Sequence, residues 1–360
     1  TITLPASASN GDQIVFTDYA RTWGTNAITI DSNGLNYQGD DDTFTVEYTT
    51  DGQSVNIVYS GSTNGWIPIE DDTVTYVPTK NNMEGIFGYG DNDAGTYYSL
   101  TNLVSNAGVI SSDVTGVGTG RSYLAACEYG TDKAIFGFGY TGSYVDETNL
   151  VSNAGVVATD VTGVGTDRRM LAACSYGEDK GIFGYGYTGS VVSMSNLVSN
   201  VGVVADDVTG VGTARQRLAA TEYGTDKGIF GYGDTSGWVS MTNLVSNLGV
   251  VATDTTGVGT ARAYLAACGY GEDKGIFSFG SDGGATNLVS NVGVIASDVT
   301  QVGTAREKLA ACEYGGDKGI FGYGAGPVSM TNLVSNAGVV ATDTTGVGTA
   351  RQAPAACSFN

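Results

Sequence analysis

The chain has 360 residues, a formal net charge of −21, 55 glycines, five prolines and no histidine. A protein with this negative charge repels phosphate backbones and anionic bilayers, so we do not expect it to bind nucleic acid. The sequence has no apolar run of about 18 residues, so we do not expect it to insert into a membrane. The lack of histidine excludes a Ser-His-Asp triad, a Cys-His pair and histidine-bound zinc or copper.

The first 80 residues predict a small antiparallel β-sandwich. Short alternating runs read as strands, and sequences such as SNGD and TDGQ mark the turns between them. The chain opens with TITLPASAS, without Met or an apolar leader, and is expected to be a processed product or part of a longer protein. The expected strands are residues 1–4, 13–18, 27–32, 43–48, 54–61, 65–69 and 74–77.

Pro78–Lys80 is the expected hinge, so the predicted domains are residues 1–80 and 81–360.

The second domain contains one sequence unit that is repeated six times. The string NLVSN begins at residues 102, 149, 196, 243, 287 and 332. Each unit contains four short apolar runs separated by Gly and Asp turn signals. Four-stranded units with a period near 45 residues predict β-propeller blades, and glycines inside the runs argue against a solenoid of helix pairs.

The repeats resemble those of the kelch family. The resemblance rests on ARQRLAATEYG, KGIFGYG and SNLVSNVG, it covers about 275 residues, and it implies a fold without implying an activity. Two departures are Gly-Tyr-Gly in place of a double glycine and the missing outer-strand Trp. In the kelch phase the last strand, Ala355–Cys357, pairs with Ile86–Tyr89. The predicted fold class is therefore all-β: an N-terminal antiparallel β-sandwich followed by a six-bladed kelch-like β-propeller closed by its C-terminal strand.

Comparison of the six copies separates fixed from variable segments. The turns written YGTDKG and SNAGV hardly change, whereas the loop after GIFGYG and the two residues after a fixed arginine vary freely. In an up-and-down blade both variable segments lie on one face, which predicts a recognition surface there. Aromatic rings beside polar residues suit sugars or a protein epitope. The predicted ligand-binding residues are Tyr97, Tyr98, Tyr123, Tyr144, Arg169, Arg217, Trp238, Tyr264 and Lys308.

Three further patterns predict structural roles. A ring of fixed arginines could grip an anion, but a bracket with the aspartate eight residues earlier in the same unit is the favoured interpretation. The five cysteines are expected to be small buried fillers. Residues 39–42 and 91–95 lack the last glutamate of a calcium loop, so no metal and no cofactor are expected. The structural arginines are Arg121, Arg168, Arg215, Arg262, Arg306 and Arg351.

Residues 1–70 resemble a module of bacteriophage tail fibres and other virion appendages, through LPA, GDQIVFTD, NAITID and GWI. The resemblance implies a virion location, contact with other virion subunits and a homotrimer. The predicted function is a non-enzymatic adhesin that recognises a host surface glycan or protein. Two alternatives stay open: a purely architectural subunit of a virion or extracellular filament, and a glycan-cleaving propeller enzyme with two loop carboxylates.

Overall fold

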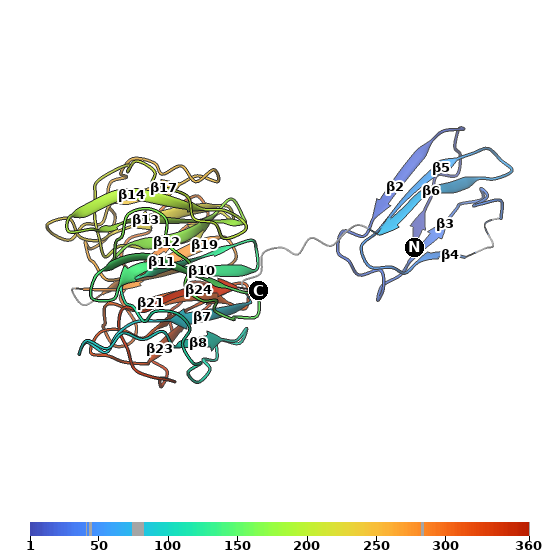
Figure 1. The fold of residues 1–360 in the computed structure, drawn as a ribbon. Coiled ribbons are helices and arrows are strands. Elements are labelled where there is room, and N and C mark those ends of the chain that lie inside the picture. Colours follow the sequence, from blue (N-terminus) through green and yellow to red (C-terminus); the bar gives the residue numbers. More distant parts are fainter. Residues whose placement is uncertain (41, 43–44, 74–82, 282–283, 360) are drawn as a thin grey trace. The chain divides into compact units, whose positions relative to one another are not determined.

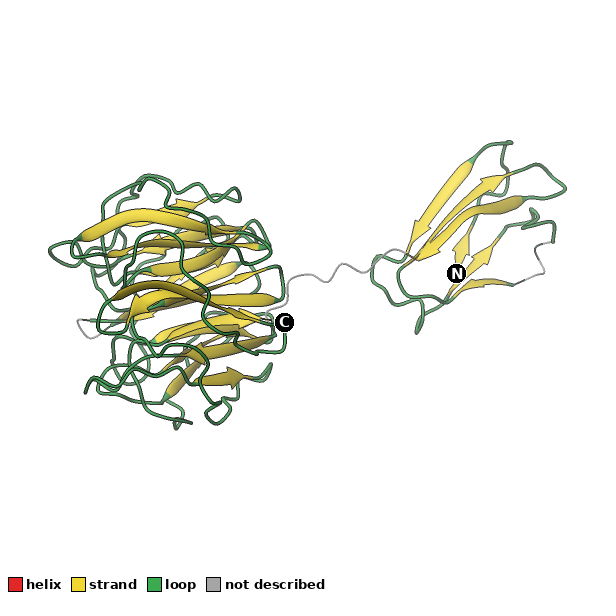
Figure 2. Ribbon diagram, in the orientation of Figure 1, coloured by secondary structure: helices red, strands yellow, loops and turns green. Residues whose placement is uncertain are grey.

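The computed structural model describes residues 1–40, 42, 45–73, 83–281 and 284–359. Within these residues the protein consists of strands, turns and loops without a helix (Figures 1 and 2), which confirms the predicted all-β class. No helix long and apolar enough for a membrane span occurs there. The chain divides into two compact units, Thr1–Thr79 and Lys80–Asn360. The strand predicted at residues 74–77 and the hinge at 78–80 lie outside the described residues.

The first unit contains two three-stranded sheets within its described residues, with orders β1-β3-β4 and β2-β5-β6. Leu4, Ile30, Val55 and Trp66 come from both sheets and share one buried core. The strands are β1 (Ile2–Thr3), β2 (Gln13–Thr17), β3 (Ile28–Asp31), β4 (Val46–Tyr48), β5 (Gln53–Tyr59) and β6 (Trp66–Thr73).

The prediction that this sandwich is wholly antiparallel is wrong, because β1 pairs with β3 in parallel. The reason is that β2 lies between them in sequence and belongs to the other sheet. Two changes of direction bring β3 back into the direction of β1, where Ile2 lies opposite Ile30.

The second unit contains six three-stranded antiparallel sheets within its described residues, each with an inner, a middle and an outer strand. In that order they are β24 (Ala355–Phe359), β7 (Glu84–Gly88) and β8 (Thr101–Val104); β9 (Ala125–Tyr129), β10 (Lys133–Tyr140) and β11 (Tyr144–Val151); β12 (Ala172–Tyr176), β13 (Lys180–Tyr187) and β14 (Val191–Val198); β15 (Ala219–Tyr223), β16 (Lys227–Gly231) and β17 (Thr242–Val245); β18 (Ala266–Tyr270), β19 (Lys274–Phe279) and β20 (Ala285–Val289); and β21 (Ala310–Tyr314), β22 (Lys318–Gly322) and β23 (Thr331–Val334).

The predicted pairing of the C-terminal strand is confirmed. In the sheet formed with β7, Ala355 lies opposite Gly88 and Cys357 opposite Ile86. The inner strands contact one another in the order β9, β12, β15, β18, β21 and β24, and β24 in turn contacts β9. The last strand of the chain therefore lies between the first and the last complete repeats.

The predicted fourth strand of each unit is not continuous. After β8 the chain returns to it only through two isolated bridges, at Ile110 and Val114. Between these bridges the returning segment advances four residues where β8 advances three, and the extra residue interrupts the ladder. The side chain of Asn102 covers the gap by donating from Nδ2 to Ser111 O at 3.0 Å and to Asp113 Oδ1 at 2.9 Å. This role explains why NLVSN keeps its first asparagine.

Contacts between neighbouring sheets explain why GIFG is repeated. A Cβ at Gly181 would lie 2.4 Å from Cys127 Sγ of the preceding sheet, and one at Gly184 would lie 2.7 Å from Phe230 Cζ of the following sheet. At these two positions glycine leaves room for the sulfur and the ring, which fill the space between sheets. Ala134 and Ser278 occupy the equivalent positions in two other repeats. All five cysteines are buried free thiols.

The sequence GYG at the end of the GIFGYG motif in β13 forms a β-bulge. The register between β13 and β14 shifts between Gly184 and Gly186, and Tyr185 has a φ of 63°. Its ring packs on Phe230, with centroids 5.2 Å apart, and the Arg215 guanidinium lies 4.2 Å from its centroid. The left-handed residue thus delivers an aromatic ring into the space between two sheets.

Candidate functional site

Strand order places the loops of the second unit on two opposite faces. We call the face with the inner–middle turns and the turns after the outer strands the fixed face, and the opposite one the variable face. Gly130 N of one fixed turn donates to Asp179 O of the next at 2.8 Å, and Asn200 Nδ2 donates to Asp179 Oδ2 at 3.0 Å. Fixed turns therefore bind one another, which restricts their sequences.

The fixed arginines lie buried between sheets. Arg168 donates from Nε to Tyr185 O at 3.0 Å and from Nη2 to Asn196 Oδ1 at 2.6 Å, and its guanidinium lies 4.0 Å from the Phe138 centroid of the preceding sheet. Burial lowers the pKa of Arg168 to about 10. The six equivalent side chains are at most 6% exposed, which leaves no surface for an anion: Arg121, Arg168, Arg215, Arg262, Arg306 and Arg351.

The predicted Arg–Asp bracket within one unit is wrong, because the arginine meets the aspartate of the next unit. Arg121 Nη1 lies 3.8 Å from Asp160 Oδ1, and Thr119 Oγ1 donates to Asp160 Oδ2 at 2.7 Å. The segment before each arginine crosses from one sheet to the next, so the carboxylate within reach is the following one. Arg351 closes the series with Asp113, which accepts from Thr349 Oγ1 at 2.6 Å.

Six equivalent residues on the variable face are joined by backbone hydrogen bonds. Each is the second residue after a fixed arginine, and each has a φ between 48° and 57°. Each N–H donates to the carbonyl of its predecessor, and Tyr123 N donates to Ala353 O at 3.1 Å, so the series returns to its start. We call this set the axial ring: Tyr123, Met170, Arg217, Tyr264, Lys308 and Ala353.

The axial ring surrounds a cavity of about 80 Å³, which is smaller than a typical ligand pocket. Four predicted residues meet here: Tyr123, Arg217, Tyr264 and Lys308. The rings of Tyr123 and Tyr264 lie 6.4 Å apart, and burial, with a contribution from Asp91, raises the pKa of Tyr123 to about 12. A cavity of this size admits water or the tip of a ligand, so a larger molecule must bind across the face.

A second group lies beside the axial ring, around the half-buried Arg169. Its guanidinium carbon lies 4.5 Å from the ring centroid of Tyr140, 5.4 Å from that of Tyr144, 5.8 Å from that of Tyr123 and 5.9 Å from that of Tyr187. Arg169 Nε is buried and has no hydrogen-bond partner within the described residues. We call these five residues, together with Tyr97, the Arg169 cluster.

Strand geometry assembles this cluster. Tyr140 and Tyr144 are directly opposite each other at the end of the β10–β11 hairpin, with rings 5.9 Å apart. Tyr97 reaches Tyr140 from the preceding sheet at 6.0 Å, and Tyr187 reaches Tyr144 from the following sheet at 6.0 Å. Burial raises the pKa of Tyr97, with contributions from Tyr140 and Asp91. The result is a tyrosine-rich surface around one cation.

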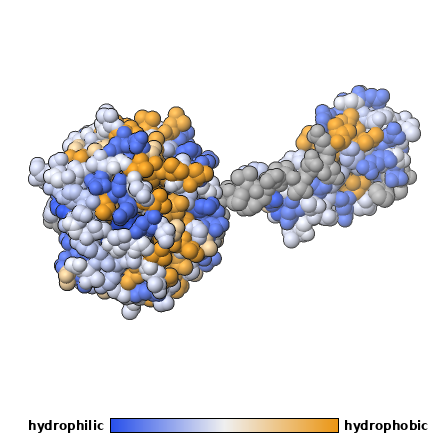
Figure 3. All heavy atoms as spheres, in the orientation of Figure 1, coloured by the Kyte–Doolittle hydropathy of each residue, from blue (hydrophilic) through white to orange (hydrophobic). Residues whose placement is uncertain are grey.

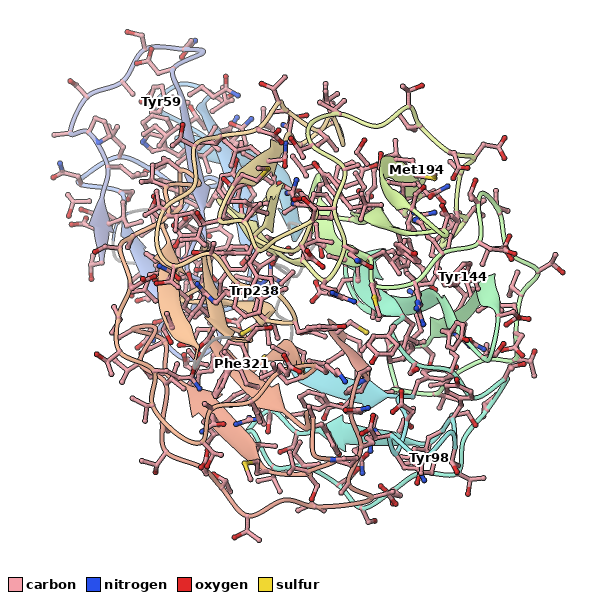
Figure 4. The ribbon with its side chains drawn as sticks, turned by 90° about the vertical axis from the view of Figure 1, so that its left-hand side faces the viewer. Tyr59, Tyr98, Tyr144, Met194, Trp238 and Phe321 are labelled. Atoms are coloured by element: carbon pink, nitrogen blue, oxygen red, sulfur yellow. The ribbon has the colours of Figure 1, made fainter. Side chains whose placement is uncertain are left out.

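Two predicted residues lie apart from both groups. Trp238 is 47% exposed on the loop after β16, and Tyr98 occupies the loop after β7. Figure 4 looks onto the second unit and places Tyr98, Tyr144 and Trp238 over different sheets. These residues therefore cannot contact one small ligand together.

Sequence reasoning missed Tyr140, Tyr187 and Met170. The signal for the first two was the string YTGS, which directly follows the middle-strand glycine in two consecutive repeats. A three-residue connection after such a tyrosine extends both strands and places the ring beside its cross-strand neighbour. Met170 occupies the same position as Tyr123, one repeat later, and is counted here because it lines the axial cavity.

The carboxylates of the variable face form no metal group of three or more within the described residues. Asp91 and Asp93 accept hydrogen bonds from Gln352 Nε2 at 3.0 and 2.6 Å. Burial, followed by the neighbouring Asp167, raises the pKa of Asp146.

Comparison with protein-family models and with curated proteins found no match for this sequence.

Proposed function

We propose that the second unit is a six-bladed, kelch-like β-propeller closed by β24, and that its variable face binds a glycan or protein on a host cell surface. The cyclic contacts of the inner strands and the closed series of bonds in the axial ring support this fold. In this proposal the protein is a non-enzymatic virion adhesin, joined to other virion subunits and trimeric through its fibre-type first unit.

One observation carries the proposal. Residues free to vary among the repeats gather on a single face, where they bring tyrosines and cations together around Arg169 and the axial ring. Strand β7 begins at the opposite, fixed face, where Glu84 lies opposite Phe359 of β24.

The architectural alternative has its own supporting observation. The turns after the outer strands each expose a valine by 62–65% of its surface, and Leu248 is 77% exposed. Figure 3 shows hydrophobic residues gathered on the surface of the second unit. Such patches commonly mark contacts with other proteins. The exposed valines are Val109, Val156, Val203, Val250, Val294 and Val339.

Binding experiments with two matched double variants separate these functions. The purified chain is applied to a glycan array and to a panel of bacterial cells, and both retention and release of sugar are measured. We expect retention without sugar release. Tyr144→Ser with Tyr264→Ser should abolish retention, and Val156→Ser with Val203→Ser should leave it intact. Retention lost only in the valine variant would support the architectural role, and released sugar would support the enzyme.

A further inference from the structure

The Arg169 cluster has the chemistry of a site for an acidic saccharide. We propose that it binds a sugar bearing a carboxylate, with the guanidinium of Arg169 contacting the acid and the tyrosines contacting the sugar ring. This inference rests on the proposed adhesive function and names the ligand class.

The first argument is the unsatisfied guanidinium. Arg169 forms no ion pair or hydrogen bond through its side chain with any other described residue. The nearby carboxylates of Asp91 and Asp93 instead accept from Gln352. A guanidinium stacked on aromatic rings keeps its planar fork of N–H donors, which matches a carboxylate through two parallel hydrogen bonds.

The second argument is the contrast with Arg217, the other variable-face arginine beside the axial cavity. Arg217 Nη1 donates to Asp234 Oδ2 at 2.7 Å, so its charge already has a partner. The chain carries a net charge of −21, and a cation left without a carboxylate is therefore unusual within it. Its retention beside four tyrosine rings points to an external anion.

The third argument is the surface around the guanidinium. The hydroxyls of Tyr97, Tyr140, Tyr144 and Tyr187 form no hydrogen bond to another described side chain, and their rings are half-buried. Such a surface offers apolar ring faces to the C–H side of a sugar and free hydroxyls to its polar edge. Its residues come from three neighbouring sheets.

The site occurs once in each chain. Arg169 is the only cation directly after a fixed arginine. It is also the only residue at this position that is flanked in the sequence by two YTGS strings, which begin at Tyr140 and Tyr187. The other residues at this position are Ser122, Gln216, Ala263, Glu307 and Gln352.

The test uses the full chain and three forms of one oligosaccharide: ending in a uronic acid, the same sugar after reduction of the carboxyl to an alcohol, and an O-sulfated form. Affinities are measured by calorimetry or ligand-observed NMR. We expect the uronic acid to bind at least about tenfold more tightly than the reduced sugar. Tighter binding of the sulfated form would overturn the assignment of a carboxylate.

The variants are Arg169→Gln, Arg169→Lys and, as the control, Lys227→Gln at the fixed face, where the lysine pairs with Asp226, with circular dichroism to check folding. Arg169→Gln should remove the preference for the acid, Arg169→Lys should keep part of it, and Lys227→Gln should change it less than threefold, or by roughly 0.6 kcal/mol. Binding of neutral sugars with no effect of Arg169→Gln overturns this inference alone. Binding of no saccharide and no cell overturns the proposed function as well.

Discussion

The two faces of the second unit come from the same six repeats but differ in what holds their residues. On the fixed face each turn bonds to the turn of a neighbouring sheet, as Gly130 does to Asp179, so a change in one repeat disturbs another. On the variable face the axial ring joins all six repeats through backbone hydrogen bonds, which do not depend on the side chain, and side-chain contacts between repeats, such as that of Tyr97 with Tyr140, differ from one repeat to the next. A repeat of this kind can thus keep its scaffold and change its surface.

The adjacent residues Arg168 and Arg169 show the same contrast between a residue held by the scaffold and a residue free to vary. Arg168 is buried with three hydrogen-bond acceptors, whereas Arg169 is half-buried with stacking contacts alone. We expect Arg168→Met to cost about 3–5 kcal/mol in the free energy of unfolding, because it leaves buried acceptors without donors. Urea unfolding followed by near-ultraviolet circular dichroism measures the loss.

Arg169→Met is the control for that measurement, with an expected cost below about 1 kcal/mol. Equal losses in the two variants would mean that the variable position is also part of the scaffold, and the distinction between the faces would fail.

Two glycines, one between sheets and one on a variable loop, should show the same contrast with a smaller change in the free energy of unfolding. A Cβ at Gly184 would meet Phe230, whereas one at Gly237 would meet no atom within 4 Å, and Gly237 has no positive φ. We expect Gly184→Ala to cost about 1–3 kcal/mol through overpacking between sheets. Gly237→Ala, on the variable loop, should be neutral or slightly stabilising. Thermal unfolding of both variants gives the answer, and a neutral Gly184→Ala would contradict the packing argument.

Two aspartates should respond to pH with opposite signs and small amplitudes. Burial raises the pKa of Asp207, but hydrogen bonds from Thr166 and Asn196 and the charge of Arg168 outweigh it and leave the pKa below its ordinary value. Its stabilising contribution is therefore present above the unfolded-state pKa and lost as the pH falls through the folded-state value. Asp207→Asn should reduce stability at neutral pH and flatten its decline below about pH 4.

Asp146 has a raised pKa, so its charged form is disfavoured in the folded state. Serine occupies the equivalent position at Ser193, Ser240 and Ser329. Asp146→Ser should stabilise the protein slightly at neutral pH, and this gain should vanish below about pH 4, where both states are protonated. Urea unfolding at pH 3.5 and pH 7 tests both variants, and the same sign for both would refute the assignment.

Much of the fold of the second unit could be predicted from its sequence repeats. Six copies of NLVSN, with GIFGYG or its variants AIFGFG and GIFSFG before each, indicated the strands of the second unit, and their phase indicated the partner of Ala355–Cys357. The outer segment was misread as a strand because a repeat pattern does not reveal that the Asn102 side chain, with one extra residue opposite it, replaces the backbone ladder.

What the sequence determined by itself was local: strand and turn positions, the absence of histidine chemistry, and the division of the repeats into constant and changing segments. Tertiary structure decided what meets across sheets. It paired Arg121 with Asp160 of the next repeat and gathered Tyr140, Tyr144 and Tyr187 around Arg169. A repeated sequence shows which residues recur along the chain. Contacts between sheets depend on how far each side chain extends toward the next sheet, and the distance between the sheets is set only in the tertiary structure.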